Sequence, residues 1–139
     1  MGSFVPFSFR AWVKRLDWKS GTLQPDEAVI DGDSAHIFVD RGMYEYQAAP
    51  CRLYGINTPE MTDKDPVVRS KAVAARDFLR GLILGREVFV QSMMLDKYGR
   101  PIVIIWTDVA QFGDRSKSVN RAMIDAGHSV AYLQDHGPL

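Results

Sequence analysis

Cysteine is almost absent from this chain of 139 residues, which contains only Cys51. A single cysteine excludes an internal disulfide, and no Cys/His spacing resembles a zinc site. The sequence also lacks internal repeats, low-complexity linkers, a Ser-His-Asp arrangement and a glycine-rich phosphate loop. We therefore expect one ordinary globular domain, in which Cys51 is a small buried residue of a strand.

Long hydrophobic runs are missing as well. The longest, residues 102–106, is far too short to span a bilayer. Arg10, Lys14 and Arg15 interrupt the apolar residues near the N-terminus, which therefore lack the core of a signal peptide. These features predict a soluble protein without a signal peptide or membrane contact, located in the cytoplasm or within a particle.

The chain has no excess of charge of either sign, because 17 lysines and arginines balance 17 aspartates and glutamates. A nucleic-acid-binding protein is usually basic. Any affinity for nucleic acid must therefore come from local clusters of cations rather than from the field of the whole molecule.

The first half of the sequence is typical of successive β-strands. Aromatic and β-branched residues predict a strand over residues 7–16, and Ser20-Gly21 and Pro25-Asp26 then mark a loop. Residues 29–30 lead into an Asp-Gly turn, and further strands are expected at residues 35–39 and 47–56, with a turn at Arg41-Gly42.

The second half mixes helices with a hairpin. Asp65 is a suitable N-cap and Pro66 a suitable first residue for a helix that Gly85 closes. Its apolar residues recur at helical spacing: Val68, Ala72, Ala75, Leu79 and Leu82. Residues 87–93 and 102–106 flank Tyr98-Gly99 as a hairpin, a second helix runs to Gly127, and residues 130–133 form a short edge strand.

This order of elements predicts an α+β fold, with helices packed on a small closed or partly closed β-barrel. The loops at the rim of such a barrel can converge on one face. Three motifs that are distant in the sequence can therefore share one site.

The first motif is Asp31-Gly32-Asp33. Taken alone it is most simply a turn, because Asp-Gly favours positive φ. Its functional interpretation is that Asp33 directs a carboxylate oxygen at Ca²⁺ or a similar hard cation, while Asp31 orients a bound water.

The second motif runs from Arg52 to Glu60. Arg52 is either a surface residue of a strand or a guanidinium that grips a phosphate through two hydrogen bonds. Glu60 is either the polar end of a loop or the general base for an attacking water. Pro59 biases Thr58 toward an extended backbone, which can turn the Thr58 carbonyl toward a cation.

The third motif is Asp96-Lys97-Tyr98-Gly99-Arg100, which taken alone is a hairpin loop. In the functional interpretation Arg100 is a second phosphate clamp, and Tyr98 bonds the same phosphate or stacks on a base. The tryptophans Trp12, Trp18 and Trp106 are expected to pack in the barrel or at an interface.

In this order, the three motifs together with residues 118–127 resemble the staphylococcal nuclease (thermonuclease-like) family. The resemblance implies a five-stranded OB-fold barrel with two packed helices over residues 29–134. Residues 1–28 would extend the barrel with a strand and a loop, and residues 135–139 would form a short tail. It also implies a Ca²⁺-dependent nuclease that hydrolyses DNA, RNA or both and leaves 3′-phosphates.

The same resemblance assigns roles to individual positions. Arg52, Glu60 and Arg100 match the catalytic trio, and Asp33, Asn57 and the Thr58 carbonyl fall on calcium-ligand positions. Asp31, Lys97 and Tyr98 would assist the metal, phosphate or substrate.

At position 57 the family has an aspartate. The amide oxygen of Asn57 can still coordinate a cation, but one negative charge is lost. We expect calcium binding to be weaker by about one to two orders of magnitude.

A second hypothesis starts from Asn57 and the balanced charge. The chain would then be a catalytically weak or silent module on the same barrel. It would bind nucleic acid or serve as a structural component, with protein partners in a larger assembly such as a phage particle. The intact trio favours the nuclease.

Overall fold

The computed structural model describes residues 8–139, so Phe7, at the start of the first expected strand, lies outside the described residues. The strands are β1 Ser8–Trp12, β2 Arg15–Asp17, β3 Thr22–Gln24, β4 Val29–Asp31, β5 Ser34–Gly42, β6 Glu45–Leu53, β7 Ile56–Asn57, β8 Glu87–Leu95, β9 Pro101–Trp106 and β10 Val130–Ala131. The helices are α1 Pro66–Ile83 and α2 Val119–Asp125, with 3₁₀ turns η1 Val109–Gln111 and η2 Arg115–Lys117 between β9 and α2.

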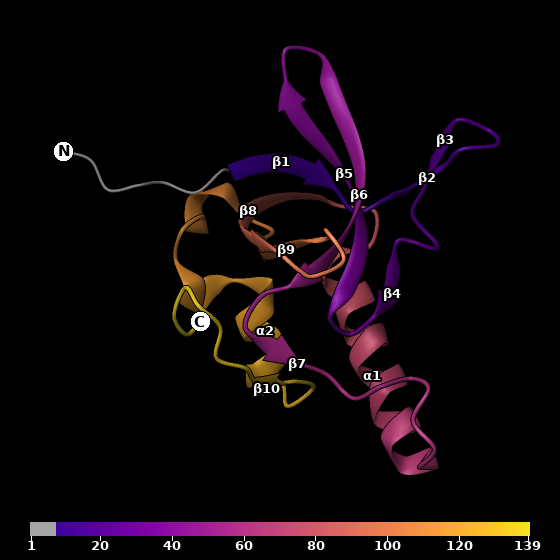
Figure 1. Cartoon of the computed structure of the whole chain (residues 1–139), viewed down its shortest axis with the longest axis vertical. Helices are drawn as coiled ribbons and strands as arrows, with labels where there is room; N and C mark the ends of the chain where they lie inside the picture. Colours follow the sequence, from indigo (N-terminus) through magenta and orange to yellow (C-terminus); the bar gives the residue numbers. More distant parts are fainter. Residues whose placement is uncertain (1–7) are drawn as a thin grey trace.

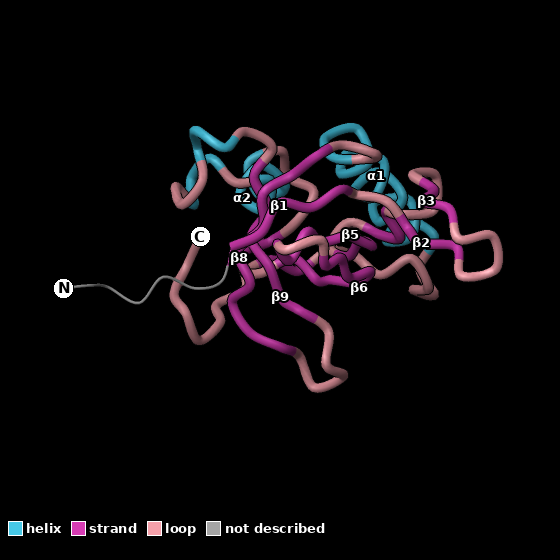
Figure 2. Tube along the Cα trace, turned by 90° about the horizontal axis from the view of Figure 1, so that it is seen from above, coloured by secondary structure: helices cyan, strands magenta, loops and turns pink. Residues whose placement is uncertain are grey.

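Five strands close into a barrel (Figure 1). Their order is β1-β8-β9-β6-β5, and β5 pairs with β1 again through Ala11↔Val39 and Trp12↔Phe38. Strand β4 continues the sheet beside β5, and both α-helices lie on the same side of the strands (Figure 2). The predicted α+β OB-fold barrel with two helices is confirmed.

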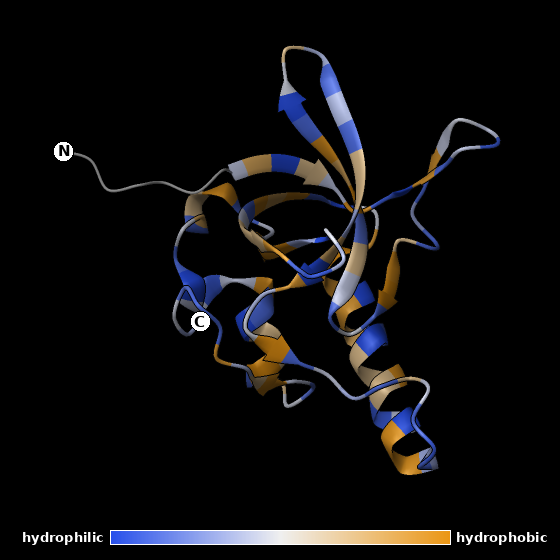
Figure 3. Cartoon of the chain, in the orientation of Figure 1, coloured by the Kyte–Doolittle hydropathy of each residue, from blue (hydrophilic) through white to orange (hydrophobic). Residues whose placement is uncertain are grey.

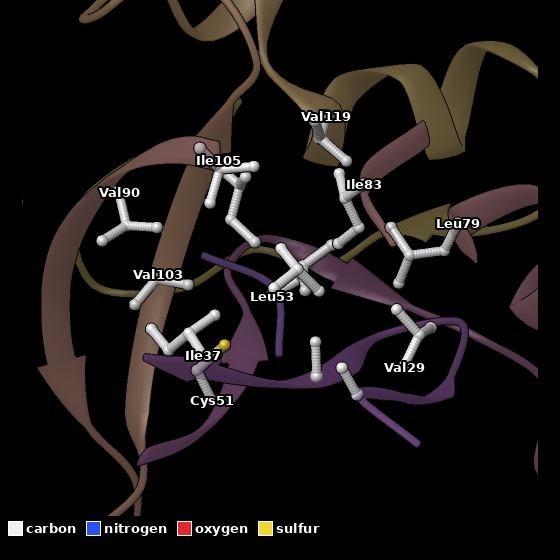
Figure 4. Close-up of a cluster of buried hydrophobic side chains, with 14 of the residues drawn as sticks. Val29, Ile37, Cys51, Leu53, Leu79, Ile83, Val90, Val103, Ile105 and Val119 are labelled. Carbon is white, nitrogen blue, oxygen red and sulfur yellow. The ribbon is translucent and has the colours of Figure 1, made fainter. Parts of the chain in front are cut away.

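The barrel interior and α1 share one hydrophobic core (Figure 4). Leu53 and Ile105 of the barrel and Leu79 and Ile83 of the helix are fully buried. Cys51 is buried among them, and the loss of hydration raises the pKa of its thiol to about 12. The interpretation of Cys51 as a small core residue is therefore confirmed.

Helix α1 begins as the sequence predicts. The side chain of Asp65 accepts a hydrogen bond from the Val67 amide, and Pro66 occupies the first turn. Hydrophilic and hydrophobic residues are mixed along the helix (Figure 3), and those buried against the barrel are Ala72, Ala75, Leu79 and Ile83. No helix among the described residues is long and apolar enough to cross a membrane.

The single first strand predicted for residues 7–16 is wrong in its extent. Strand β1 ends at Trp12, because Val13 then exchanges backbone hydrogen bonds with Gly85 and Arg86 instead of with a strand. The chain next forms a separate β2–β3 hairpin, which the sequence pattern did not indicate. Trp18 lies in its turn and is 81% exposed, so it does not pack in the barrel; packing at an interface stays a prediction.

Two other boundaries differ. The turn predicted at Arg41-Gly42 lies at Met43 and Tyr44, which take positive φ angles of 54° and 65°. Strand β6 ends at Leu53 rather than at residue 56, because Gly55 (φ 79°) turns the chain into β7.

Candidate active site

Two arginines line the same groove at one end of the barrel because of how β6 and β9 pair. The two strands run parallel with Arg52 beside Ile102, so Arg100, just before β9, lies near Arg52. Both side chains line an open groove of about 340 Å³. Sequence positions that lie far apart thus contribute to one surface.

The groove contains five of the predicted site residues: Arg52, Asn57, Lys97, Tyr98 and Arg100. It also contains residues that sequence reasoning did not assign to the site: Asp96, Ile102, Tyr132 and Gln134. Tyr132 and Gln134 follow β10, which pairs antiparallel with β7 through Val130↔Asn57. The sequence predicts an edge strand at residues 130–133 but does not show which strand it pairs with. Without that pairing, nothing in the sequence assigned Tyr132 and Gln134 to the site.

Arg52 joins the groove to the acidic turn between β4 and β5. Its Nη2 donates a hydrogen bond to Oδ1 of Asn57 at 3.1 Å and lies 3.7 Å from Oδ2 of Asp33. The Asp33 side chain is only 14% exposed, whereas that of Arg52 is 31% exposed. The Asn57 amide oxygen and the Asp33 carboxylate oxygen therefore both face the same nitrogen of the Arg52 guanidinium.

The carboxyl group of Asp33 is held in an unfavourable environment for its charge. Burial, together with the neighbouring Asp31 carboxylate, raises the pKa of Asp33 to about 7. Arg52 opposes this rise, and the charge of Glu60 adds to it. Glu60 is exposed on the loop after β7 and is not among the residues that line the groove.

The acidic turn is fixed by its own hydrogen bonds. Oδ1 of Asp31 accepts from the Asp33 amide at 3.1 Å and from the Ser34 hydroxyl at 2.7 Å. This arrangement confirms the turn, and it leaves the Asp33 carboxylate directed at Arg52.

Gly32 lets the acidic turn approach Thr58 and helix α1. A Cβ at position 32 would lie 2.5 Å from Cγ2 of Thr58 and 2.8 Å from Cβ of Ala75. The Thr58 hydroxyl is in turn 3.0 Å from the hydroxyl of Ser129, which is almost fully buried. Thr58 is therefore held between the acidic turn and the segment after α2.

Arg100 is oriented by Asp96 at the other side of the groove. Its Nε donates to Oδ2 of Asp96 at 2.7 Å, and Oδ1 of Asp96 accepts from the amides of Tyr98 and Arg100. Burial raises the pKa of Asp96, but these hydrogen bonds together outweigh burial, so the pKa is lowered. The cations of Lys97 and Arg100 lie 5.2 Å and 5.7 Å from the centre of the exposed Tyr98 ring.

The chain end covers the turn that leads into β7. The buried Tyr54 hydroxyl donates to the Gly137 carbonyl and accepts from the His136 amide. The Gln134 side chain accepts from the Gly55 amide at 2.7 Å. The last residues therefore hold the turn that precedes Asn57.

Comparisons with known proteins identify the family of this chain. A family model described as "Staphylococcal nuclease homologue" matches residues 50–137, which is more than half of the chain. The chain therefore belongs to the staphylococcal nuclease homologue family, a family of nuclease type. "Protein ParB" of Escherichia coli is 30% identical over 106 residues, or 75% of this chain and 54% of that protein. The chain thus spans about half the length of this relative.

Proposed function

We propose that this chain is a metal-dependent phosphodiesterase that hydrolyses DNA, RNA or both. The observation that carries the proposal is that Arg52 and Arg100 line one groove, with Asn57 and Asp33 in contact with the Arg52 guanidinium. Two guanidinium forks beside oxygen donors suit a phosphodiester, whose negative charge grows as it is attacked.

The donor set fits a hard divalent cation, and calcium is the ion we propose. Asp33 and Asn57 direct oxygens at the same nitrogen, and the pKa of Asp33 is raised by burial and by Asp31, which a bound cation would reverse. Within the described residues no group of three His, Cys, Asp or Glu side chains could hold a metal. Asp33, the Asn57 amide and the Thr58 carbonyl would therefore hold the ion together with waters, and the ion would neutralise charge on the phosphate.

The protein residues divide the remaining work. Arg52 and Arg100 bind the phosphate oxygens, and Asp96 keeps the Arg100 guanidinium oriented. Glu60 takes a proton from a water whose oxygen bonds to phosphorus. The bond from phosphorus to the 5′ oxygen breaks, that oxygen is protonated from solvent, and a 3′-phosphate remains.

The test is cleavage of a fluorescent single-stranded DNA across a calcium titration. We expect the wild type to cleave, Glu60→Gln to lose about 100-fold or more in rate, and Asn57→Asp to work at lower calcium. Glu45→Gln, at an exposed glutamate in β6, is the matched control and should behave as wild type.

The silent module remains the alternative that Asn57 favours. If the wild type is inert and Asn57→Asp cleaves, the fold has kept its catalytic residues and lost its metal. If the wild type and all of the variants are inert at millimolar calcium, the nuclease proposal fails. The chain is then a module that binds nucleic acid or serves as a structural component of a larger assembly.

A further inference from the structure

The outer face of β5 and β6 leads directly away from Arg52. Residues of these strands alternate between the core and the outside, and Ile37 and Cys51 point inward. The pairs Ser34↔Arg52, His36↔Pro50, Phe38↔Ala48 and Asp40↔Tyr46 therefore follow one another along the outer face. At about 3.3 Å per residue, Tyr46 lies roughly 20 Å from Arg52 along β6.

The far part of this face is a group of aromatic rings. Phe38 and Tyr46 stack with ring centres 5.4 Å apart and planes 10° apart. Trp12 of β1 lies 6.4 Å from Tyr46, and the Arg10 guanidinium lies 5.0 Å from the Trp12 ring. Tyr46 is 49% exposed, so this stack presents a ring to solvent.

A hollow of about 150 Å³ lies between the aromatic group and Arg52. It is formed where the β2–β3 hairpin stands beside the outer face, and its lining includes Lys14, Arg15, Trp18, His36 and Pro50. We call the surface made by Arg52, this hollow and the rings of Phe38, Tyr46 and Trp12 the aromatic track.

The charges on the aromatic track favour an anionic ligand. Two arginines beside the track are engaged with acids: Arg10 lies 3.0 Å from Asp40 and 3.8 Å from Glu87, and Arg15 lies 2.8 Å from Glu27. Lys14 adds a cation at the hollow. A polymer that carries both flat bases and phosphates matches a surface with rings at one end and cations between them and Arg52.

We propose that the aromatic track binds the single-stranded part of a nucleic acid, with bases stacked on Tyr46 and its neighbours and phosphates beside Lys14 and Arg15. The inference rests on the proposed nuclease function, because Arg52 at one end of the track would hold the phosphate to be cut. OB-fold domains that bind single strands cover about 4–16 nucleotides, which suits a track that extends beyond the groove. Stacking on rings would make the recognition tolerant of sequence.

Binding is tested first without cleavage, in EDTA, by the fluorescence anisotropy of a labelled oligothymidine of twelve nucleotides. Removing one stacking ring typically weakens single-strand binding about 5- to 100-fold, and we expect this of Tyr46→Ala. Tyr46→Phe keeps the ring and should stay within about twofold of wild type. Tyr44→Ala is the matched control, because this tyrosine lies in the turn beyond the track and is 97% exposed.

The phosphate contact has its own readout. Lys14→Gln should lower the slope of log affinity against log salt by about 0.7, the value for one contact with a single strand. In kinetics, Tyr46→Ala should raise KM for the twelve-nucleotide substrate and leave KM for a small nitrophenyl phosphodiester unchanged, since the latter reaches only the groove.

The outcomes separate the two proposals. Binding that depends on Tyr46, without any cleavage, keeps the track and rejects the nuclease. The track is overturned if the wild type cleaves and binds oligothymidine no more tightly than Tyr46→Ala does. It is also overturned if Tyr44→Ala loses as much affinity for oligothymidine as Tyr46→Ala. Self-association that Tyr46→Ala abolishes while oligothymidine binding is unchanged would also overturn it, and would assign the face to a second copy of this chain.

Discussion

Nη2 of Arg52 donates a hydrogen bond to Oδ1 of Asn57 at 3.1 Å and lies 3.7 Å from Oδ2 of Asp33. The guanidinium therefore links an amide to a carboxylate, where an aspartate at position 57 would give it a second carboxylate. One negative charge fewer means weaker attraction for both the arginine and a cation. The identity of residue 57 thus sets how strongly this end of the barrel holds positive charge.

Asn57→Asp should strengthen calcium binding by about 10- to 100-fold, because it adds a carboxylate to the donor set. The measurement is calorimetric titration of the EDTA-stripped protein, which does not depend on activity. Gln111→Glu adds the same charge at an exposed position of η1 and should leave the affinity unchanged. An equal gain in both variants would show that net charge, and not coordination, is responsible.

Asp33→Asn should change how stability depends on pH in the metal-free protein. The pKa of Asp33 rises from 3.8 to about 7 on folding, so the folded state holds its proton more tightly than the unfolded state. The resulting stability is present below pH 3.8 and is lost as the pH rises to 7, on the order of a few kcal/mol. Urea unfolding from pH 4 to 8 should show this loss in wild type and not in the variant.

Asp114→Asn provides a comparison of opposite sign. Hydrogen bonds from Ser116 lower the pKa of Asp114, so its contribution is present above pH 3.8 and is lost as the pH falls. If both variants shift the pH profile in the same direction, the assignment to Asp33 is wrong.

Asn120→Ala should be among the most destabilising single changes in the chain. The side chain is fully buried in α2, accepts from the Ile105 amide, and donates to the carbonyls of Tyr54 and Val103. Its removal leaves three buried backbone groups without a hydrogen-bond partner. Each costs about 1–3 kcal/mol of folding stability if it finds no new partner. Chemical denaturation should therefore show a loss of roughly 3 kcal/mol or more, against about 1 kcal/mol for Ser118→Ala at the N-cap of the same helix.

Gly32→Ala and Gly81→Ala should have opposite effects. A Cβ at position 32 would collide with Thr58 and Ala75, whereas nothing lies within 4 Å of one at position 81 in α1. We expect Gly32→Ala to cost about 1–3 kcal/mol and to weaken calcium binding by moving Thr58. Gly81→Ala should stabilise by about 0.5–1 kcal/mol in the same thermal or urea unfolding measurement. Equal affinity for calcium in both variants would argue against Thr58 as a ligand.

Replacing the hairpin turn by Met43→Asn with Tyr44→Gly should stabilise the protein. Both residues adopt positive φ, which asparagine and glycine tolerate far better than methionine and tyrosine. The expected gain is about 1–3 kcal/mol, read as a shift in the urea midpoint with an unchanged slope. A neutral result would mean that the turn relaxes to a different geometry in solution.

Local rules determined the parts of the fold that depend on short stretches of sequence. Asp65 and Pro66 start α1 wherever the helix packs, because a cap acts on the backbone next to it. Tyr98 and Gly99 similarly fall in the turn between β8 and β9, as the sequence predicts. Predictions failed where backbone hydrogen bonds to other segments decide the structure. Examples are the end of β1 at Trp12 and the β2–β3 hairpin.

The sequence by itself determined which side chains are available for chemistry: two arginines, a glutamate and the oxygen donors of the acidic turn, in an order that resembles one family. Only the tertiary structure decided which of them meet. The parallel pairing of β6 with β9 brings Arg100 to Arg52, and the pairing of β7 with β10 adds Tyr132 to the groove. Strand register is a long-range property, set by packing between segments far apart in the chain, and a single sequence does not reveal it.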